Sequence, residues 1–417
     1  MLLAVGAAVA ALLPAGGRLP PPLSPSDGVH TFTYDSVQRR LPLIAEAVIE
    51  NNPRFPPSLV GELRGLGAEI AAGKPLKPLV EPDADWSNLL APLLERGETW
   101  FSTPWWISEN YFYKRLLELT DAAPGVGPEV DPFEQQKADS LAGSADAFRS
   151  ACASGLCETR ELASLVAFAL WGNLADLSLS AGAKLIAPDA ASSGEGMESG
   201  SSMMLVDETA ELCHALSSCA GKEILIVLDN CGLELVSDLL MVDGLLRIVE
   251  PSRVVLHAKD RPVFVSDVQP KDLAGHIEWL SQVEPGTGSA MAARLNAALD
   301  DGRLTVEAPP FYTSARPFWE MPEEVRAAYE GAAVVITKGD ANYRRLLGDL
   351  HWAHDYSFAD LTGAYWPAAT ALAALRTCKS GVLVGTAPEA EAAAAAAHPE
   401  KWLVGGLYGC VQLKPAA

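Results

Sequence analysis

The sequence has few cysteines, and their arrangement excludes zinc fingers and disulfide frameworks. Its seven cysteines form no CxxC pair and have no histidine spacing suited to zinc. An odd, scattered set is typical of a reducing compartment. Cys231 and Cys378 lie inside motifs described below, yet no histidine adjoins either residue in sequence. We therefore interpret both as packing residues and not as nucleophiles.

Basic residues are also scarce relative to acidic ones. The chain has 31 Lys and Arg against 53 Asp and Glu, which gives a formal net charge of −22. This balance excludes a general nucleic-acid binder, because phosphate contacts need clustered basic side chains. It does not exclude a small phosphorylated metabolite, since a divalent ion and a few local cations can reverse the field inside one cleft.

Long apolar runs are nearly absent. Residues 1–14 are apolar, but they precede the first cation, Arg18, and therefore lack the charged start of a secretory signal. The run is also too short to span a bilayer comfortably. We expect a soluble, cytoplasmic protein without a membrane partner. A signal or transit role for residues 1–17 stays open, and the oligomeric state is not set by the sequence.

The residues that are present predict a large α/β protein. A chain of 417 residues with 49% hydrophobic content is long and apolar enough for two cores, or for one large core with a helical companion. After residue 169, apolar runs alternate with helix-length segments, which is typical of βαβ units and a mostly parallel sheet. Strands are expected at residues 223–229, 254–258, 304–308, 332–337 and 381–384.

The rest of the chain predicts a helical N-terminal domain and a flexible loop. Residues 36–51 and 57–72 have apolar side chains at the three- and four-residue intervals of amphipathic helices. We expect a leader at residues 1–21, a helical domain at 22–168 and an α/β domain at 169–417, with helices on both faces of its sheet in a Rossmann-like three-layer arrangement. Residues 188–202 are rich in Ser, Gly and Glu and predict a surface loop.

An aromatic patch lies inside the helical part. We interpret it as core packing beneath a helical cap, because bulky aromatic side chains form cores more often than binding platforms. The alternative is that it lines one wall of a substrate cleft. The patch consists of Trp100, Trp105, Trp106, Tyr111, Phe112 and Tyr113.

Two strand ends carry acidic side chains. The apolar run 224–228 stops at Asp229 and Asn230, and a helix is expected to follow Gly232. A second short apolar strand, residues 262–267, ends in Asp267 before another helix. Ligands bind at the carboxyl ends of strands in open α/β sheets, and oxygen ligands of this kind suit a hard cation. The alternative for Asp229 or Asn230 is a helix cap.

Two further segments offer groups for an anion. Gly339 follows a buried strand and permits a tight turn, after which Asp340, Asn342 and Arg344 can bind hydroxyl and anionic groups. The alternative is an N-cap at Asp340 and a solvated helix face at Arg344. Residues 376–379 end an expected helical segment, where their cations either bind phosphate or complement the helix dipole.

The ordered set of motifs resembles the metal-dependent damage-control phosphatases. The branch is also called acidic-residue methyltransferase-like or sugar phosphate phosphatase, and is subfamily III with the RTxK motif. The resemblance covers about residues 22–413. The motifs that carry it are TWFSTPWWISENYFYKRLLEL, LWGNLADLSLSAG, LDNCGLELVSDLL, FVSDVQPKD, FWEMPEE, ITKGDANYRRLLGD and LRTCK.

The resemblance implies roles for individual residues. It implies that Asp229, Asn230 and Asp267 are catalytic and bind a divalent metal, with Mn²⁺ the first choice and Co²⁺, Ni²⁺ or Mg²⁺ the alternatives. The implied substrate contacts are Asp229, Asn230, Glu234, Asp340, Ala341, Asn342, Tyr343, Arg344, Arg376, Thr377 and Lys379. The chain departs from the branch where Leu174 and Ala175 replace an Arg-Cys pair, which puts the substrate preference in doubt.

Three functions follow from these observations. The first is a metal-dependent phosphatase acting on sugar phosphates of the fructose 1-phosphate or fructose 6-phosphate class, or on related damaged phosphometabolites. The second, implied by the name of the branch, is S-adenosylmethionine-dependent carboxyl O-methylation of protein glutamate, although no GxGxxG loop follows the first strand of the α/β region. The third is a sugar-phosphate binder without catalysis.

Overall fold

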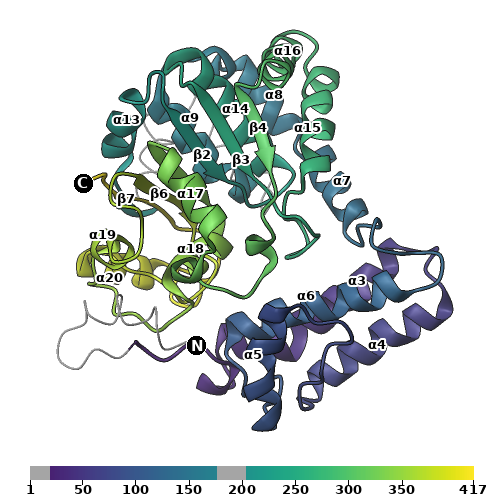
Figure 1. Cartoon of the computed structure of the whole chain (residues 1–417). Helices are drawn as coiled ribbons and strands as arrows, with labels where there is room; N and C mark the ends of the chain where they lie inside the picture. The colour runs from purple at the N-terminus through teal and green to yellow at the C-terminus, as the bar shows by residue number, and fades with distance from the viewer. Residues whose placement is uncertain (1–18, 176–202) are drawn as a thin grey trace.

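A helical N-terminal unit lies beside an α/β unit in the computed structural model, which describes residues 19–175 and 203–417 (Figure 1). Most of the expected leader and the whole of the expected loop at 188–202 lie outside the described residues, as does Asp176, which follows the Leu174-Ala175 departure. Within the described residues, no helix is both long enough and apolar enough to cross a lipid bilayer.

The N-terminal unit consists of short helical turns followed by amphipathic helices. On α4 (Pro57–Ala71) the buried residues include Leu59, Leu63, Leu66 and Ile70, which repeat at helical intervals and face a common core. The expected helices at 36–51 and 57–72 are therefore confirmed. The elements of the unit are η1 (Pro25–Asp27), α2 (Phe32–Asp35), the π-helical turn η2 (Ser36–Arg40), α3 (Leu41–Asn51), α4 (Pro57–Ala71), α5 (Ala84–Glu95) and α6 (Trp105–Ala122).

Four following elements pack with the sheet rather than with this unit. They are α7 (Glu134–Gly143), α8 (Ala145–Ala153), η3 (Leu156–Glu158) and α9 (Leu162–Ala175). Helix α9 lies against α14 (Leu233–Ile248). Their close approach needs glycine, because a Cβ on Gly172 would lie 2.2 Å from Ser237 Oγ. The division into domains at residue 168 stays a prediction.

The sheet has seven strands in the order β1-β7-β6-β5-β2-β3-β4. The five strands from β6 to β4 are parallel, whereas β7 is antiparallel to β6 and β1 runs with β7. The strands are β1 (Met204–Asp207), β2 (Glu223–Val227), β3 (Arg253–His257), β4 (Leu304–Glu307), β5 (Val334–Lys338), β6 (Ala371–Thr377) and β7 (Gly409–Lys414).

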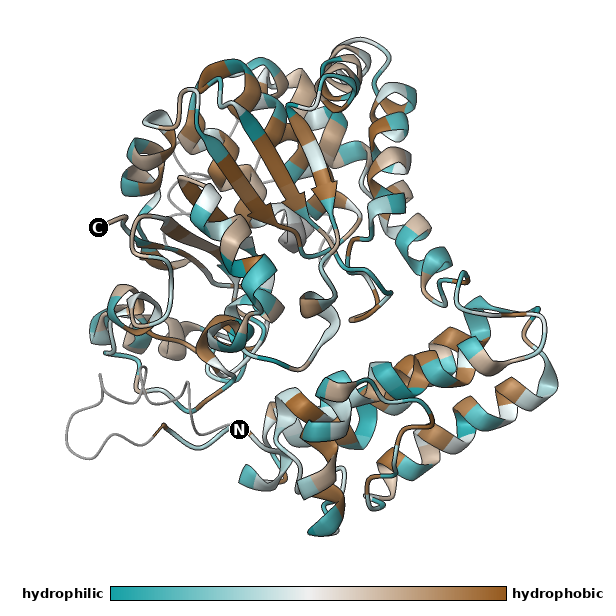
Figure 2. Ribbon diagram, viewed as in Figure 1, coloured by the Kyte–Doolittle hydropathy of each residue, from teal (hydrophilic) through white to brown (hydrophobic). Residues whose placement is uncertain are grey.

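Helices cover both faces of this sheet, so the predicted three-layer α/β fold is confirmed. Successive residues of β2 point to opposite faces, which puts Ile224 and Ile226 in one core and Leu225 and Val227 in another. Figure 2 shows the apolar strands between these layers. One face packs against α8, α9, α13 (Thr209–Ser217), α14, α15 (Pro270–Val283) and α16 (Thr287–Asp300).

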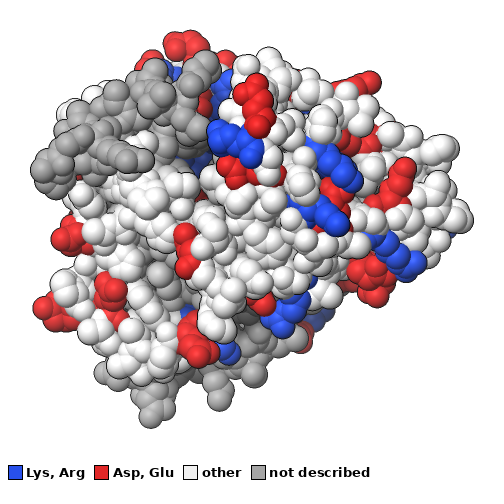
Figure 3. All heavy atoms as spheres, turned by 90° about the horizontal axis from the view of Figure 1, so that it is seen from below, with Lys and Arg blue, Asp and Glu red and all other residues white. Residues whose placement is uncertain are grey.

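The other face packs against shorter elements and the N-terminal unit. These elements are η4 (Pro310–Thr313), η5 (Phe318–Glu320), α17 (Glu323–Gly331), α18 (Gly339–Leu347) and α19 (Phe358–Gly363), and α20 (Pro388–Ala397) lies near β1. The aromatic patch is buried in this core, as expected. Figure 3 shows Lys and Arg side chains lying among Asp and Glu side chains on one face of the molecule.

The strand expected at 381–384 is wrong, and β6 takes its place. Residues 371–377 are rich in Ala and Leu, which are helix formers, but burial on both faces of the sheet overrides that propensity. The backbone at 381–384 bonds to side chains instead of to a strand. Arg376 Nη1 donates to the Val382 carbonyl at 2.5 Å, and Val384 N donates to the Tyr343 hydroxyl at 3.3 Å.

Candidate active site

The loops after β2 and β3 meet at the carboxyl edge of the sheet. The amide of Val268 donates to the Asp229 carbonyl at 2.9 Å, and Asn230 and Asp267 form an isolated antiparallel bridge. These backbone contacts bring the Asp229 and Asp267 side chains to the same buried region at the sheet edge. The two acidic side chains were expected to lie close together, and they do.

Asp267 reaches this place by a different route from the one expected. Residues 262–267 form a loop, not a strand, and its two ends are tied by a 2.8 Å hydrogen bond from Lys259 N to the Val268 carbonyl. Phe264 and Val265 have positive φ angles of 51° and 70°, which suit a turn and not an extended strand. The apolar residues serve another contact, because Phe264 stacks on Trp106 of α6 with ring centroids 6.0 Å apart.

The two carboxylates have oxygen atoms without hydrogen-bond partners. Asp229 is 4% exposed and Asp267 is 1% exposed, yet Asp229 Oδ1 and both Asp267 oxygens accept no hydrogen bond from the described residues. Burial raises the pKa of Asp229 well above its ordinary value and that of Asp267 to about 6. Lys259, whose Nζ lies 3.4 Å from Asp267 Oδ2, opposes this shift without cancelling it. The negative charge of the two carboxylates is therefore not fully balanced by the protein, and a cation bound there would stabilise it.

The Asn230 side chain links the loop to α14. Its Nδ2 donates to Asp229 Oδ2 at 2.8 Å and to Glu234 Oε2 at 2.9 Å, while its Oδ1 accepts from Ser266 Oγ at 2.6 Å. The amide oxygen therefore faces the loop that carries Asp267. Two carboxylates and one amide oxygen form a hard donor set of the kind that Mg²⁺ and Mn²⁺ accept.

The helix-cap alternative for Asp229 and Asn230 is wrong. The N-cap residue of α14 is Gly232, with φ 75°, and no side chain in the described part of the chain caps the helix. The Gly232 amide instead donates to His276 Nε2 at 2.9 Å, and His276 Nδ1 donates to the Asp272 carbonyl at 2.8 Å. These two bonds fix the neutral tautomer of a histidine whose pKa burial lowers.

Glu234 faces the site because the chain turns back at Gly232. It is 3% exposed, and its Oε1 lies 3.4 Å from Lys338 Nζ. Lys338 also lies 2.9 Å from Asp238 Oδ1 and donates to the Ala169 carbonyl at 2.6 Å. Sequence reasoning missed Lys338 and Lys259. Both are cations at the carboxyl ends of strands, which is the signal that could have found them.

The turn before α18 passes directly beside the Asp229 side chain. Gly339 has φ 79°, and a Cβ there would lie 1.8 Å from Asp229 Oδ2, so only glycine fits. Asn342 Nδ2 donates to the Leu228 carbonyl at 3.2 Å and to the Lys338 carbonyl at 2.8 Å. Asn342 therefore ties the end of β2 to the start of α18.

Asp340 organises the segment after β6. Its Oδ1 accepts hydrogen bonds from Arg376 Nε at 2.7 Å, Lys379 N at 3.1 Å and Ser380 Oγ at 3.1 Å. Although burial opposes the charged form, Arg376 and then Arg344 lower the pKa of Asp340 below its ordinary value. Asp340 thereby sets the position of the Lys379 backbone.

Arg344 is buried in an ion network. Its Nε lies 2.8 Å from Asp349 Oδ1, its Nη1 lies 2.6 Å from Glu109 Oε2, and its guanidinium lies over the Trp106 ring at 4.9 Å. The solvated-face alternative is therefore wrong.

Tyr343 and Ala341, two other predicted substrate contacts on α18, differ in burial. Tyr343 lies in the core and donates to Gln412 Oε1 at 2.8 Å, whereas Ala341 is half-buried.

The RTCK segment ends a strand and not a helix, so the helix-dipole alternative is wrong as well. Arg376 and Thr377 are the last residues of β6, and both are buried. Lys379 is half-buried, and its Nζ makes no hydrogen bond or ion pair with the described residues. Its charge lies close enough to Asp229 to lower the pKa of that carboxyl, although burial dominates. Lys379 is therefore a cation available to a ligand.

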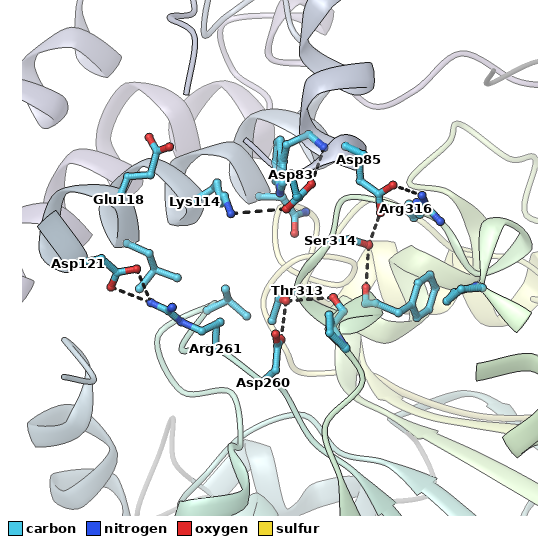
Figure 4. A pocket seen from close by; sticks show the side chains of 18 of the residues that line it. Asp83, Asp85, Lys114, Glu118, Asp121, Asp260, Arg261, Thr313, Ser314 and Arg316 are labelled. Atoms are coloured by element: carbon cyan, nitrogen blue, oxygen red, sulfur yellow. Dashed lines mark hydrogen bonds and ion pairs between the residues drawn. The ribbon is translucent and has the colours of Figure 1, made fainter. Parts of the chain in front are cut away.

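A cleft of about 530 Å³ lies between the two units and contains none of these residues (Figure 4). Ion pairs cross or line it: Arg261 with Asp121 at 2.8 Å, and Arg316 with Asp85. Thr313 Oγ1 donates to Asp260 Oδ1 at 2.6 Å. This cleft marks the junction of α5 and α6 with the loops after β3 and β4.

The described residues contain no cluster of three or more His, Cys, Asp and Glu side chains arranged to hold a metal ion. Asp229, Asp267 and Asn230 at the sheet edge include only two side chains of these four types, because the third is an amide. Their buried carboxylate oxygens without partners and their raised pKa values nevertheless fit a divalent cation.

Comparison with known proteins gives matches over most of the chain. The family model described as the damage-control phosphatase ARMT1-like domain matches residues 36–394. The protein named damage-control phosphatase ARMT1 from Xenopus tropicalis is 31% identical, with 92% of this chain and 96% of that protein covered. The human protein of the same name is 28% identical over 94% of this chain and 98% of its own length. A DUF89 family protein from Pyrococcus horikoshii gives a TM-score of 0.45 at 15% identity, covering 83% of this chain and 92% of that one.

Proposed function

The chain belongs to the damage-control phosphatase ARMT1-like family, and on that basis we propose that it is a metal-dependent phosphomonoesterase. Its proposed substrates are sugar phosphates of the fructose 1-phosphate or fructose 6-phosphate class, or related damaged phosphometabolites. The relatives are named for phosphatase activity, so carboxyl methylation is not proposed.

One observation carries this proposal. Asp229 and Asp267 are both buried, yet three of their carboxylate oxygens have no hydrogen-bond partner among the described residues. Lys259, 3.4 Å from Asp267 Oδ2, offsets only part of this negative charge, because the pKa of Asp267 stays raised. Burying carboxylates that are incompletely compensated destabilises a protein, so such oxygens persist where a ligand completes them. The position at the carboxyl edge of a parallel sheet is where α/β folds bind ligands.

In the proposed site Asp229, Asn230 and Asp267 hold the cation. Mn²⁺ is the first choice, and Co²⁺, Ni²⁺ or Mg²⁺ are alternatives because hard oxygen ligands accept several ions. When bound, a divalent cation polarises a phosphoryl oxygen and stabilises the charge that develops during hydrolysis. Asp229 stands beside the phosphoryl group, either as the nucleophile or as the group that orients the attacking water.

The chain's own cations neutralise the remaining phosphoryl oxygens. Lys379 is the proposed direct contact because its Nζ makes no hydrogen bond or ion pair with the described residues. Thr377 adds a hydroxyl at the same strand end. The other predicted substrate contacts are bonded to groups of the protein itself, so we propose that they position loops and do not bind phosphate directly. These are Asp340, Asn342, Tyr343, Arg344 and Arg376, while Glu234 accepts a hydrogen bond from Asn230 and Ala341 follows Asp340 on α18.

Phosphate release from a panel of phosphate esters tests the proposal. The purified protein is stripped with a chelator and then supplied with Mn²⁺, Co²⁺, Ni²⁺ or Mg²⁺. We expect release that needs a metal and that disappears in Asp229→Ala but not in Asp121→Ala, which alters a carboxylate of the separate cleft. Full activity of Asp229→Ala, or activity that a chelator does not reduce, would overturn the proposal.

A further inference from the structure

The face of α6 that looks toward the site carries Trp106, Glu109 and Tyr113. These residues are three and four positions apart and therefore lie on one side of the helix. Trp106 stacks on Phe264 of the loop that carries Asp267, and Glu109 Oε2 accepts from Arg344 Nη1 at 2.6 Å. This face covers the loop after β3 and the end of α18.

Tyr113 differs from Trp106 and Glu109 because its hydroxyl is buried without a hydrogen-bond partner among the described residues, as is Nε1 of Trp105 on the same helix. The residue is 1% exposed, and its hydroxyl makes no hydrogen bond with the described residues. The ring packs against Phe264 at 5.1 Å and Phe133 at 6.0 Å, which fixes its direction. A phenol that gives up water without gaining a partner destabilises the protein, so the position calls for an explanation.

The surroundings of the hydroxyl point to the candidate site. Burial raises the pKa of Tyr113, so the group stays a neutral donor at physiological pH. The charges that act on it belong to Arg40, Glu109, Asp267 and Arg344, and Asp267 is one of the two carboxylates with oxygens that lack hydrogen-bond partners among the described residues. The Tyr113 hydroxyl of the helical unit and the Asp267 carboxylate of the sheet edge therefore both lack hydrogen-bond partners among the described residues.

Another tyrosine of α6 shows that a partnerless hydroxyl is not a property of this helix. Tyr111 is also buried, but its hydroxyl donates to the Lys77 carbonyl at 2.6 Å and accepts from Arg115 Nη1 at 3.0 Å. Tyr111 is therefore satisfied by the fold itself. Tyr113 is not.

We infer that the Tyr113 hydroxyl donates a hydrogen bond to a hydroxyl group on the organic part of the phosphate ester. The inference rests on the proposed function. Lys379 acts on Asp229 at the sheet edge, whereas Tyr113 of the helical unit packs against Phe264 of the loop that carries Asp267. The ligand class is a polyhydroxylated phosphate ester, and Tyr113 is a specificity determinant.

The test compares two substrates in Tyr113→Phe. Fructose 6-phosphate has hydroxyl groups on its organic part, whereas 4-nitrophenyl phosphate has none. Losing one neutral hydrogen bond predicts a fall in kcat/KM of about tenfold for fructose 6-phosphate. We expect kcat/KM for 4-nitrophenyl phosphate to stay within about twofold of the wild-type value, since the phosphoryl contacts remain.

Thermal unfolding separates this role from a structural one. Tyr113→Phe keeps the ring and removes a hydroxyl without a partner, so its melting temperature is expected to equal or exceed that of the wild type. Tyr111→Phe is the matched control, because it loses a satisfied bond and is expected to melt lower with both kcat/KM values unchanged.

The outcomes distinguish the inference from the proposed function. Equal kcat/KM of wild type and Tyr113→Phe on fructose 6-phosphate overturns the inference alone, and so does an equal loss on both substrates. A wild-type protein that hydrolyses no phosphate ester with any of the four metals overturns the proposed function, and the inference with it.

Discussion

At the scale of single residues, burial moves the pKa values of several ionisable groups away from the values that they have in water. Asp229 and Asp267 are buried carboxyls with raised pKa values, and His257 is a buried imidazole with a lowered one. Desolvation is the largest cause in each case. The two carboxyls lie where a cation fits, whereas His257 lies in the core beside Tyr312.

His257 makes stability depend on pH. Burial lowers its pKa to about 4, and its Nδ1 lies 2.6 Å from the Tyr312 hydroxyl. Glu307 lies 3.6 Å from Nε2, but it is half-exposed and screened by water, so burial decides the direction. The unfolded histidine, with its ordinary pKa near 6.5, binds a proton before the folded one does. This contribution is therefore complete above about pH 6.5 and is lost as the pH falls toward 4.

Urea unfolding at pH 7.5 and pH 5 measures the effect. We expect the wild type to lose roughly 2 kcal/mol more than His257→Gln between the two pH values, because the variant has no imidazole to protonate. Equal losses in the two proteins would show that His257 does not carry this dependence.

At the scale of elements, the turn between β5 and α18 decides the shape of the site. Gly339 and Gly302 have nearly the same φ, 79° and 77°, but a Cβ on Gly302 meets nothing within 4 Å. Alanine at either position costs roughly 1 kcal/mol of backbone strain. Only at Gly339 does the new methyl group collide with Asp229.

Gly339→Ala is therefore expected to abolish metal-dependent phosphate release, while Gly302→Ala keeps it. Phosphate assays and melting temperatures of both variants check this expectation. Activity of Gly339→Ala close to that of the wild type would mean that Asp229 need not occupy its observed position.

Elements also show what the sequence could and could not predict. The expected strands before Asp229 and Lys338 were recognisable because their apolar runs are buried on both faces. Strand β6 was missed because Ala and Leu favour helices outside a sheet. The loop at 262–267 looked like a strand because its apolar residues pack on α6, a contact between segments far apart in the sequence.

The same limit applies to the candidate site. Acids at strand ends are visible in a sequence, so Asp229 and Asp267 could be proposed. The bonds of Arg344 to Glu109 and the missing partner of Tyr113 depend on how α6 lies against the sheet edge. Local patterns do not contain that information.

At the scale of the whole molecule, two kinds of ion pair join the helical unit to the α/β unit. Arg344 and Glu109 form a buried pair, with side chains 5% and 1% exposed. Arg261 and Asp121 form a pair at the cleft between the two units, with side chains 32% and 31% exposed. Buried pairs depend on both partners far more than exposed ones, because a lone buried charge has no water to solvate it.

Urea unfolding of Arg344→Met and Arg261→Gln compares the two pairs. Arg344→Met leaves Glu109 and Asp349 buried without their main partner, so we expect a loss of about 3 kcal/mol. Arg261→Gln is expected to cost at most about 1 kcal/mol. Similar losses in both variants would contradict the view that the buried network holds the two units together.

Calorimetric titration of the chelator-treated protein with Mn²⁺ measures whether Asp229 and Asp267 hold a divalent cation. We predict one Mn²⁺ bound per chain in the wild type and in Asp121→Ala, and no detectable binding in Asp229→Ala or Asp267→Ala. Undiminished Mn²⁺ binding by either site variant, or no binding by the wild type, would show that these two carboxylates do not form a cation site.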